Sequence, residues 1–141
     1  PNSWWQYVKN GIQALNNKHH IDLKKIVGIG IAYQMHGLVL IDENLNPVRS
    51  SIIWCDSRAA AIGNETYDRM GHEYCQRQIL GSPGNFTASK LKWVQTNQPE
   101  IFEKAAYMML PGDFIAAKFS KLLSKSIPFS ISAFIFSVAI L

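Results

Sequence analysis

Hydrophobic residues near the start of the chain recur every three to four positions. After a polar stretch that begins at residue 16, one continuous apolar run follows. In residues 4–15 they fall on one face, with the 3.6-residue period of a surface helix that packs against a sheet. Residues 26–32 read Ile-Val-Gly-Ile-Gly-Ile-Ala, a composition typical of a strand buried on both faces. The pattern therefore predicts a packed helix followed by a central strand.

Shorter apolar runs after residue 37 predict further strands joined by tight turns. We expect strands at 38–41 and 51–54, with a turn at 42–47, where Asp, Asn and Pro favour a reversal of the chain. A short strand is also expected at 107–110.

Most of the remaining chain has helical patterns as far as residue 119. A loop rich in Gly, Ser and Pro is expected at 81–85, and Gly71 is expected to end a helix. The predicted helices cover residues 58–70, 72–79, 87–95, 99–106 and 113–119.

Composition changes abruptly after Ser120. Residues 127–141 carry no charge, but these 15 residues fall short of the roughly 20 that cross a bilayer, so we expect no membrane partner. The break predicts one domain over residues 1–119 and an apolar tail over 120–141, produced by truncation or a shifted reading frame.

The net charge of +4 and the pI near 9.2 raise the question of a nucleic-acid partner. The basic residues, Lys90 among them, are scattered without a run or an aromatic stripe, so we expect solvated helix faces and no nucleic acid. The two cysteines, Cys55 and Cys75, lack the spacing of a disulfide framework or a zinc site and fit a reducing cytoplasm.

The first candidate site residues are Gln34, Met35, His36 and Gly37, which close the run at 26–32. A neutral imidazole at His36 can donate one hydrogen bond and accept another from vicinal hydroxyls. A single histidine is otherwise more often structural, so the spacing alone leaves both interpretations open.

A second polar segment, residues 54–58, closes the run that ends at Trp54. The indole fits either a core aromatic or a ring stacked on the apolar face of a sugar-like ligand. For Asp56 and Arg58, a mutual ion pair that shapes the turn is favoured over ligand contact. The pair His19 and His20 is expected to be solvated, and no Walker loop, serine nucleophile elbow or zinc-protease motif occurs.

Five segments in register resemble the amino-terminal domain of the FGGY carbohydrate kinases, and within that family the kinases of xylulose. The resemblance extends over about residues 1–119. The matching segments are residues 29–40, 42–44, 52–61, 86–94 and 110–114.

The resemblance implies a partial actin-like, ribonuclease-H-like α/β domain, with a mixed sheet flanked by helices. It also implies that ATP, with Mg²⁺, phosphorylates the 5-hydroxyl of D-xylulose. Met35 and His36 are then sugar contacts; glycerol kinases carry Gln-Arg-Glu at this place, which favours a ketopentose. The substrate-binding residues implied are Gln34, Met35, His36, Gly37, Trp54, Asp56, Arg58 and Asn85.

Departures from the family pattern limit what this chain is expected to do alone. No Asp-x-Gly-Thr phosphate turn precedes Trp4, the general-base Asp of the family lies downstream of residues 110–113, and a second domain supplies most of the ATP site. We therefore expect no catalytic residue or metal site here, and a cytoplasmic parent kinase whose homodimerisation is left open. The alternatives are another pentulose or hexulose kinase, or a non-catalytic sugar-binding module.

Overall fold

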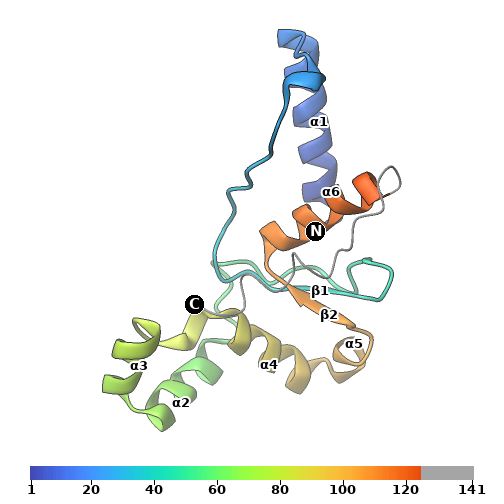
Figure 1. Ribbon diagram of the computed structural model, residues 1–141. Coiled ribbons are helices and arrows are strands. Elements are labelled where there is room, and N and C mark those ends of the chain that lie inside the picture. Colours follow the sequence, from blue (N-terminus) through green and yellow to red (C-terminus); the bar gives the residue numbers. More distant parts are fainter. Residues whose placement is uncertain (125–141) are drawn as a thin grey trace. The chain divides into compact units, whose positions relative to one another are not determined.

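The computed structural model describes the backbone of residues 1–124 and the side chains of residues 1–120 (Figure 1). The described chain divides into two compact units. The first contains residues 1–32 and 112–124, and the second contains residues 33–111. All eight predicted substrate-binding residues belong to the second unit.

The first unit contains a long helix with little cover. Helix α1 spans Asn2–His19, the short 3₁₀ helix η1 spans Leu23–Lys25, and α6 spans Pro111–Ser124. Trp5 packs edge-on against Phe119, with ring centroids 4.9 Å apart, but no residue of α1 is buried. The predicted packed face is wrong for the described residues, because an apolar face is buried only where another surface covers it.

The apolar run at 26–32 is not a strand in the structure. It is irregular, and Val27 is fully exposed while Ile29 is 63% exposed. A strand exists through hydrogen bonds to a neighbouring strand, and the described residues provide none for this run. The composition of this run does not show whether a neighbouring strand is present to pair with it. The prediction of a central strand is therefore wrong for the described chain.

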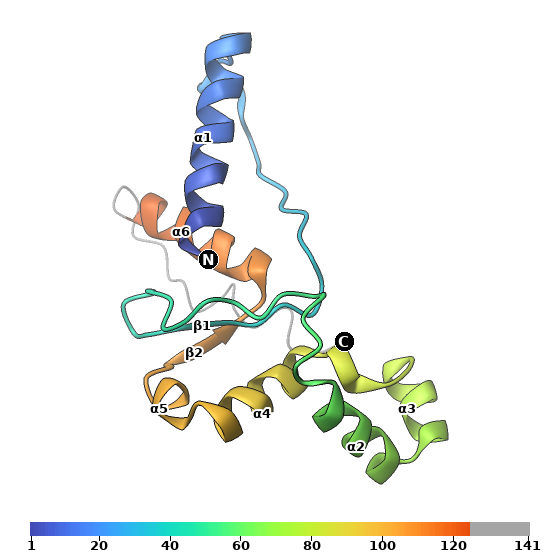
Figure 2. The ribbon, with the colours of Figure 1, turned by 180° about the vertical axis from the view of Figure 1, so that it is seen from behind.

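The sheet of the second unit has two antiparallel strands, β1 (Val39–Ile41) and β2 (Tyr107–Met109), paired so that Val39 faces Met109. The two strands lie side by side in Figures 1 and 2. Isolated bridges join Leu38 to Ile52 and Ile41 to Pro47. The sequence predicted a mixed sheet. In the described chain the strand pair and both isolated bridges are antiparallel.

The reversal at 42–47 occurs where the sequence predicted a turn. The Asp42 carboxylate accepts hydrogen bonds from the backbone N–H groups of Asn44 and Asn46, at 2.9 and 2.8 Å. This side-chain cap supplies the backbone contacts that hold the tight turn in place.

The helices of the second unit lie close to where the patterns predicted them, and Figure 1 shows them on one side of the sheet. Leu38, Leu40, Ile52 and Val94 form a buried cluster that joins the strands to one helix. The elements are α2 (Ala60–Met70), α3 (His72–Ile79), the 3₁₀ helix η2 (Pro83–Asn85), α4 (Thr87–Asn97) and α5 (Pro99–Phe102). The last helix is one turn long, shorter than the predicted 99–106.

The predicted apolar run at 127–141 lies outside the described residues. Within the described chain, no helix combines the length and apolar character that crossing a bilayer requires.

Candidate sugar-binding site

The segment Gln34–Gly37 forms a tight turn that leads into β1. His36 takes a left-handed backbone conformation with φ 57°, which non-glycine residues adopt only when their surroundings hold them there. The His36 ring stacks on Phe86, at 4.6 Å between centroids and 13° between planes. The Thr87 hydroxyl donates to the Gly37 carbonyl at 3.4 Å.

Lys90 stabilises this turn through a hydrogen bond. Its ammonium Nζ donates to the His36 carbonyl at 2.7 Å, and its side chain is fully buried. Burial lowers the pKa of Lys90, while the nearby Asp56 and Cys55 act in the opposite direction. The scatter of basic residues predicted a solvated lysine here, which is wrong because the hydrogen-bonded carbonyl compensates a buried cation.

Among the described residues, none forms a hydrogen bond with the ring nitrogens of His36, which leaves them open to a ligand of suitable chemistry. Burial, and secondly the charge of Lys90, lower the pKa of His36, so the imidazole is neutral at neutral pH. A neutral imidazole offers one donor and one acceptor. The neighbouring Met35 side chain is 68% exposed, which adds apolar surface beside these polar groups.

Trp54 is joined to this turn through its backbone. Its N–H donates to Gln34 Oε1 at 2.9 Å, and its carbonyl accepts a hydrogen bond from Asn85 Nδ2. The side chain is left 56% exposed. Three segments that are distant in sequence, residues 34–37, residues 54–58 and η2, therefore meet at one residue.

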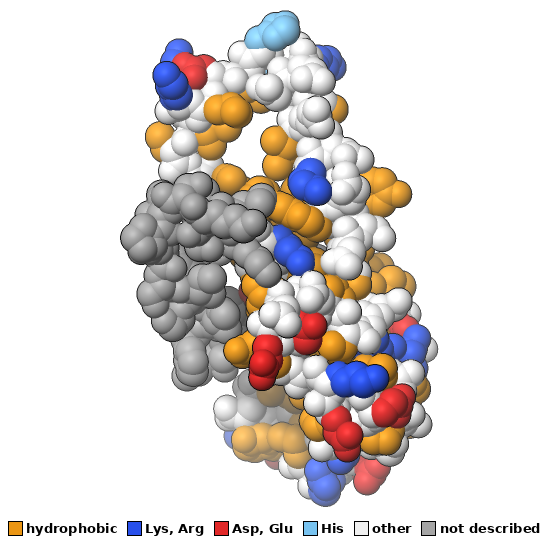
Figure 3. All heavy atoms as spheres, turned by 90° about the vertical axis from the view of Figure 1, so that its right-hand side faces the viewer, with side chains coloured by type: hydrophobic (Ala, Val, Ile, Leu, Met, Phe, Trp, Pro, Cys, Tyr) orange, Lys and Arg blue, Asp and Glu red, His pale blue; other side chains and the backbone are white. Residues whose placement is uncertain are grey.

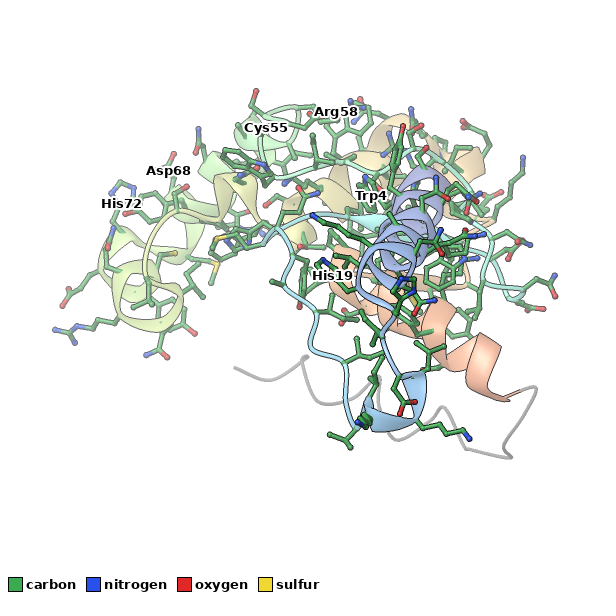
Figure 4. The ribbon with its side chains drawn as sticks, turned by 90° about the horizontal axis from the view of Figure 1, so that it is seen from above. Trp4, His19, Cys55, Arg58, Asp68 and His72 are labelled. Carbon is green, nitrogen blue, oxygen red and sulfur yellow. The ribbon has the colours of Figure 1, made fainter. Side chains whose placement is uncertain are left out.

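Asp56 and Arg58 form the ion pair that the sequence predicted. Arg58 Nη2 lies 2.8 Å from Asp56 Oδ2, Arg58 Nε lies 2.9 Å from Oδ1, and the Arg58 backbone N–H also donates to Oδ1. This bonding lowers the pKa of Asp56 and raises that of Arg58. The Arg58 guanidinium lies over the Trp93 ring at 4.9 Å, and Figure 4 shows Arg58 beside Cys55 in the segment leading into α2.

Charge and metal-ligand patterns do not suggest another kind of site in the described chain. Lys and Arg side chains are mixed with Asp and Glu side chains in the lower part of the face drawn in Figure 3. His19 and His20 are exposed, as expected. Within the described part, no group of three or more His, Cys, Asp or Glu residues could hold a metal ion.

Two supporting residues escaped the sequence predictions. Lys90 and Phe86 lie in the segment 86–94, which matched the family pattern but received no individual role. A lysine one helical turn after an aromatic residue is common on solvated helices, so their contacts with His36 could be found only from the coordinates.

These hydrogen bonds and the ring stack bring residues 34–37, 54–58 and 85–86 together. Comparison with known proteins supplies the family. Residues 1–127 match the family model described as "FGGY family of carbohydrate kinases, N-terminal domain". This chain belongs to that family.

Its relatives include several proteins named xylulose kinase. The proteins of Staphylococcus epidermidis and Escherichia coli are each 36% identical to it over 115 residues, which are 82% of this chain and 23% of theirs. The chain thus spans about a quarter of the length of these relatives.

Solved structures agree on the fold. A crystal structure described as a xyloylose kinase from Brucella ovis is 31% identical and superposes with a TM-score of 0.72, covering 82% of this chain and 24% of that one. The xylulose kinase of Bifidobacterium adolescentis, 22% identical, superposes with a TM-score of 0.68 over 86% of this chain. The described elements are therefore part of the actin-like, ribonuclease-H-like fold of sugar kinases.

Proposed function

We propose that this chain is the sugar-recognising part of a carbohydrate kinase that transfers the γ-phosphoryl group of ATP to the 5-hydroxyl of D-xylulose. The observation that carries the proposal is the meeting of Gln34, Trp54 and Asn85 beside the stacked ring of His36. Relatives at 36% identity named xylulose kinase support the choice of sugar.

The chemistry of the site suits a ketopentose. A neutral His36 ring donates to one hydroxyl and accepts from a neighbouring one, and the exposed Trp54 indole offers a flat apolar face to the carbon chain. We propose that Met35, Gly37, Asp56 and Arg58 complete the surroundings of the sugar. ATP and Mg²⁺ are then assigned to parts of the parent kinase other than the described residues.

Calorimetric titration of the chain with D-xylulose tests the proposal. We expect saturable binding, and a loss of roughly two- to tenfold in affinity for Trp54→Ala, because an aromatic contact contributes about 0.5–1.5 kcal/mol beyond burial. Trp4→Ala is the matched control, since Trp4 lies on α1 in the other unit. Absence of heat with xylulose would refute the proposal.

The same titration with a panel of ketoses and glycerol addresses specificity. Preference for another pentulose or a hexulose would replace D-xylulose while keeping the class of site. Preference for glycerol would contradict the assignment based on residues 34–37.

A further inference from the structure

The backbone of Trp54 is held on both sides by the amide side chains of two residues far away in sequence. Gln34 accepts from its N–H, and Asn85 donates to its carbonyl. Both partners belong to the same compact unit as Trp54. Since Trp54 itself follows a short irregular stretch after the bridge at Ile52, no strand ladder fixes its position.

The orientation of each side-chain amide follows from its partner. A backbone N–H can only donate, so Gln34 presents its oxygen to Trp54; a backbone carbonyl can only accept, so Asn85 presents its NH₂ group. The two bonds therefore use opposite ends of the same functional group. A change from amide to acid therefore affects the two bonds differently: it keeps the acceptor at position 34 and removes the donor at position 85.

The burial of one atom of Asn85, its amide oxygen, argues against a direct contact between that oxygen and a ligand. Asn85 Oδ1 is buried and has no hydrogen-bond partner among the described residues. The Trp54 side chain, in contrast, is 56% exposed. The indole is therefore open to a ligand, whereas the amide oxygen of Asn85 is not.

We propose that Gln34 and Asn85 are positioning residues: they clamp the Trp54 backbone from both sides and set the place of the indole at the sugar site. This replaces the direct sugar contact that family resemblance implies for these two residues. The effect on sugar affinity rests on the function proposed above, but the clamp itself can be tested without sugar.

Isosteric substitutions distinguish a clamp from direct contacts. Gln34→Glu keeps an acceptor oxygen for the Trp54 N–H, whereas Gln34→Met removes it. Asn85→Asp removes the donor and places a carboxylate oxygen against the Trp54 carbonyl. Sugar hydroxyls both donate and accept hydrogen bonds. If Gln34 and Asn85 contacted the sugar directly, the two acid variants would therefore be expected to bind sugar about equally well.

The first measurement is hydrogen exchange in the chain labelled with ¹⁵N-tryptophan. The Trp54 amide signal is assigned by its loss in Trp54→Phe. Gln34→Met is expected to speed exchange at Trp54 about five- to tenfold, the effect of one ordinary hydrogen bond, while Gln34→Glu restores slow exchange. Unchanged exchange at Trp54 in Gln34→Met would overturn the clamp.

The second measurement is xylulose affinity by calorimetry. Asn85→Asp and Gln34→Met are expected to weaken binding about five- to tenfold and Gln34→Glu less than about threefold. In a Trp54→Ala background these differences should vanish, because the positioned ring is gone. Equal losses for the two acid variants, or losses that persist without the ring, would assign Gln34 and Asn85 to direct contact instead.

The controls separate this inference from loss of fold and from failure of the proposed function. Asn97 donates its Nδ2 to the Trp93 carbonyl at 2.9 Å, so Asn97→Asp removes the same kind of bond elsewhere and should leave affinity unchanged. If Asn85→Asp unfolds, Asn85→Ala removes the donor without adding charge. If the unaltered chain binds no xylulose, the proposed function fails while exchange at Trp54 still decides the clamp.

Discussion

At position 37, the absence of a side chain is required by a neighbour. A Cβ built on Gly37 would lie 2.5 Å from Cγ and 2.9 Å from Cδ of Pro111, both closer than van der Waals contact allows. Pro111 is a ring with little freedom and is itself buried. Gly37, the last residue of the turn that carries His36, is therefore packed closely against Pro111, the first residue of α6.

Gly37→Ala is expected to destabilise the fold by about 1–3 kcal/mol, the usual cost of forcing extra volume into a packed place. The denaturant midpoint measures it. Gly11→Ala is the control, because a Cβ there meets nothing within 4 Å and Ala stabilises a helix interior by about 1 kcal/mol over Gly. If Gly37→Ala is as stable as the original chain or more stable, Pro111 moves aside at little cost in free energy.

His36 predicts a pH dependence of stability whose sign follows from its pKa. Burial lowers that pKa in the folded chain below the ordinary value of about 6.5. As pH falls below 6.5, the unfolded chain takes up a proton first, so the free energy of unfolding decreases; above 6.5 both states are neutral and the effect vanishes.

His36→Asn is expected to lose this contribution, and Asn tolerates the left-handed backbone at this position. Melting temperatures of the two proteins, compared from pH 7.5 down to pH 5, measure the difference. The original chain should lose stability faster on acidification. Parallel curves would show that the His36 ring titrates normally when folded.

Element by element, local patterns predicted more than pairing patterns did. Helix α3 has the predicted bounds, α2 ends at Gly71 as expected, and β1 and β2 lie where apolar runs were seen. The run at 26–32 failed because burial depends on what covers a segment, not on its composition. Similarly, the amide contacts of Gln34 and Asn85 depend on loop geometry that no periodicity encodes.

The contact between α2 and η2 is the element-scale feature most sensitive to volume. A Cβ on Gly63 would lie 2.2 Å from Gly84 Cα and 2.6 Å from the Pro83 carbonyl oxygen, which are backbone atoms. Gly63→Ala should therefore cost about 3 kcal/mol or more, at the upper end of overpacking effects.

Because η2 carries Asn85, Gly63→Ala should also weaken xylulose binding if the variant folds. Thermal melts and calorimetry on the same sample measure both effects, with Gly11→Ala again as control. Normal stability would mean that η2 moves away at little cost. If Gly63→Ala displaces η2 and the affinity for xylulose is unchanged, the role given to Asn85 is contradicted.

For the whole molecule, recognition of the sugar and transfer of the phosphoryl group are expected to separate. Phosphoryl transfer depends on positioning and on neutralising charge at the γ-phosphate, with a base orienting the attacking hydroxyl. The family's Asp-x-Gly-Thr turn and its general base have no counterpart in the printed sequence. The chain should therefore bind xylulose without phosphorylating it.

A coupled assay of ADP release from ATP, with D-xylulose and Mg²⁺, measures this separation on the 141-residue chain. We expect a rate equal to that without sugar, while calorimetry on the same preparation detects binding. The full-length Escherichia coli relative serves as the positive control. Saturable, sugar-dependent ADP release that copurifies with the chain would contradict the expected separation, because some residue of this chain would then have to orient the hydroxyl and stabilise the transferred group.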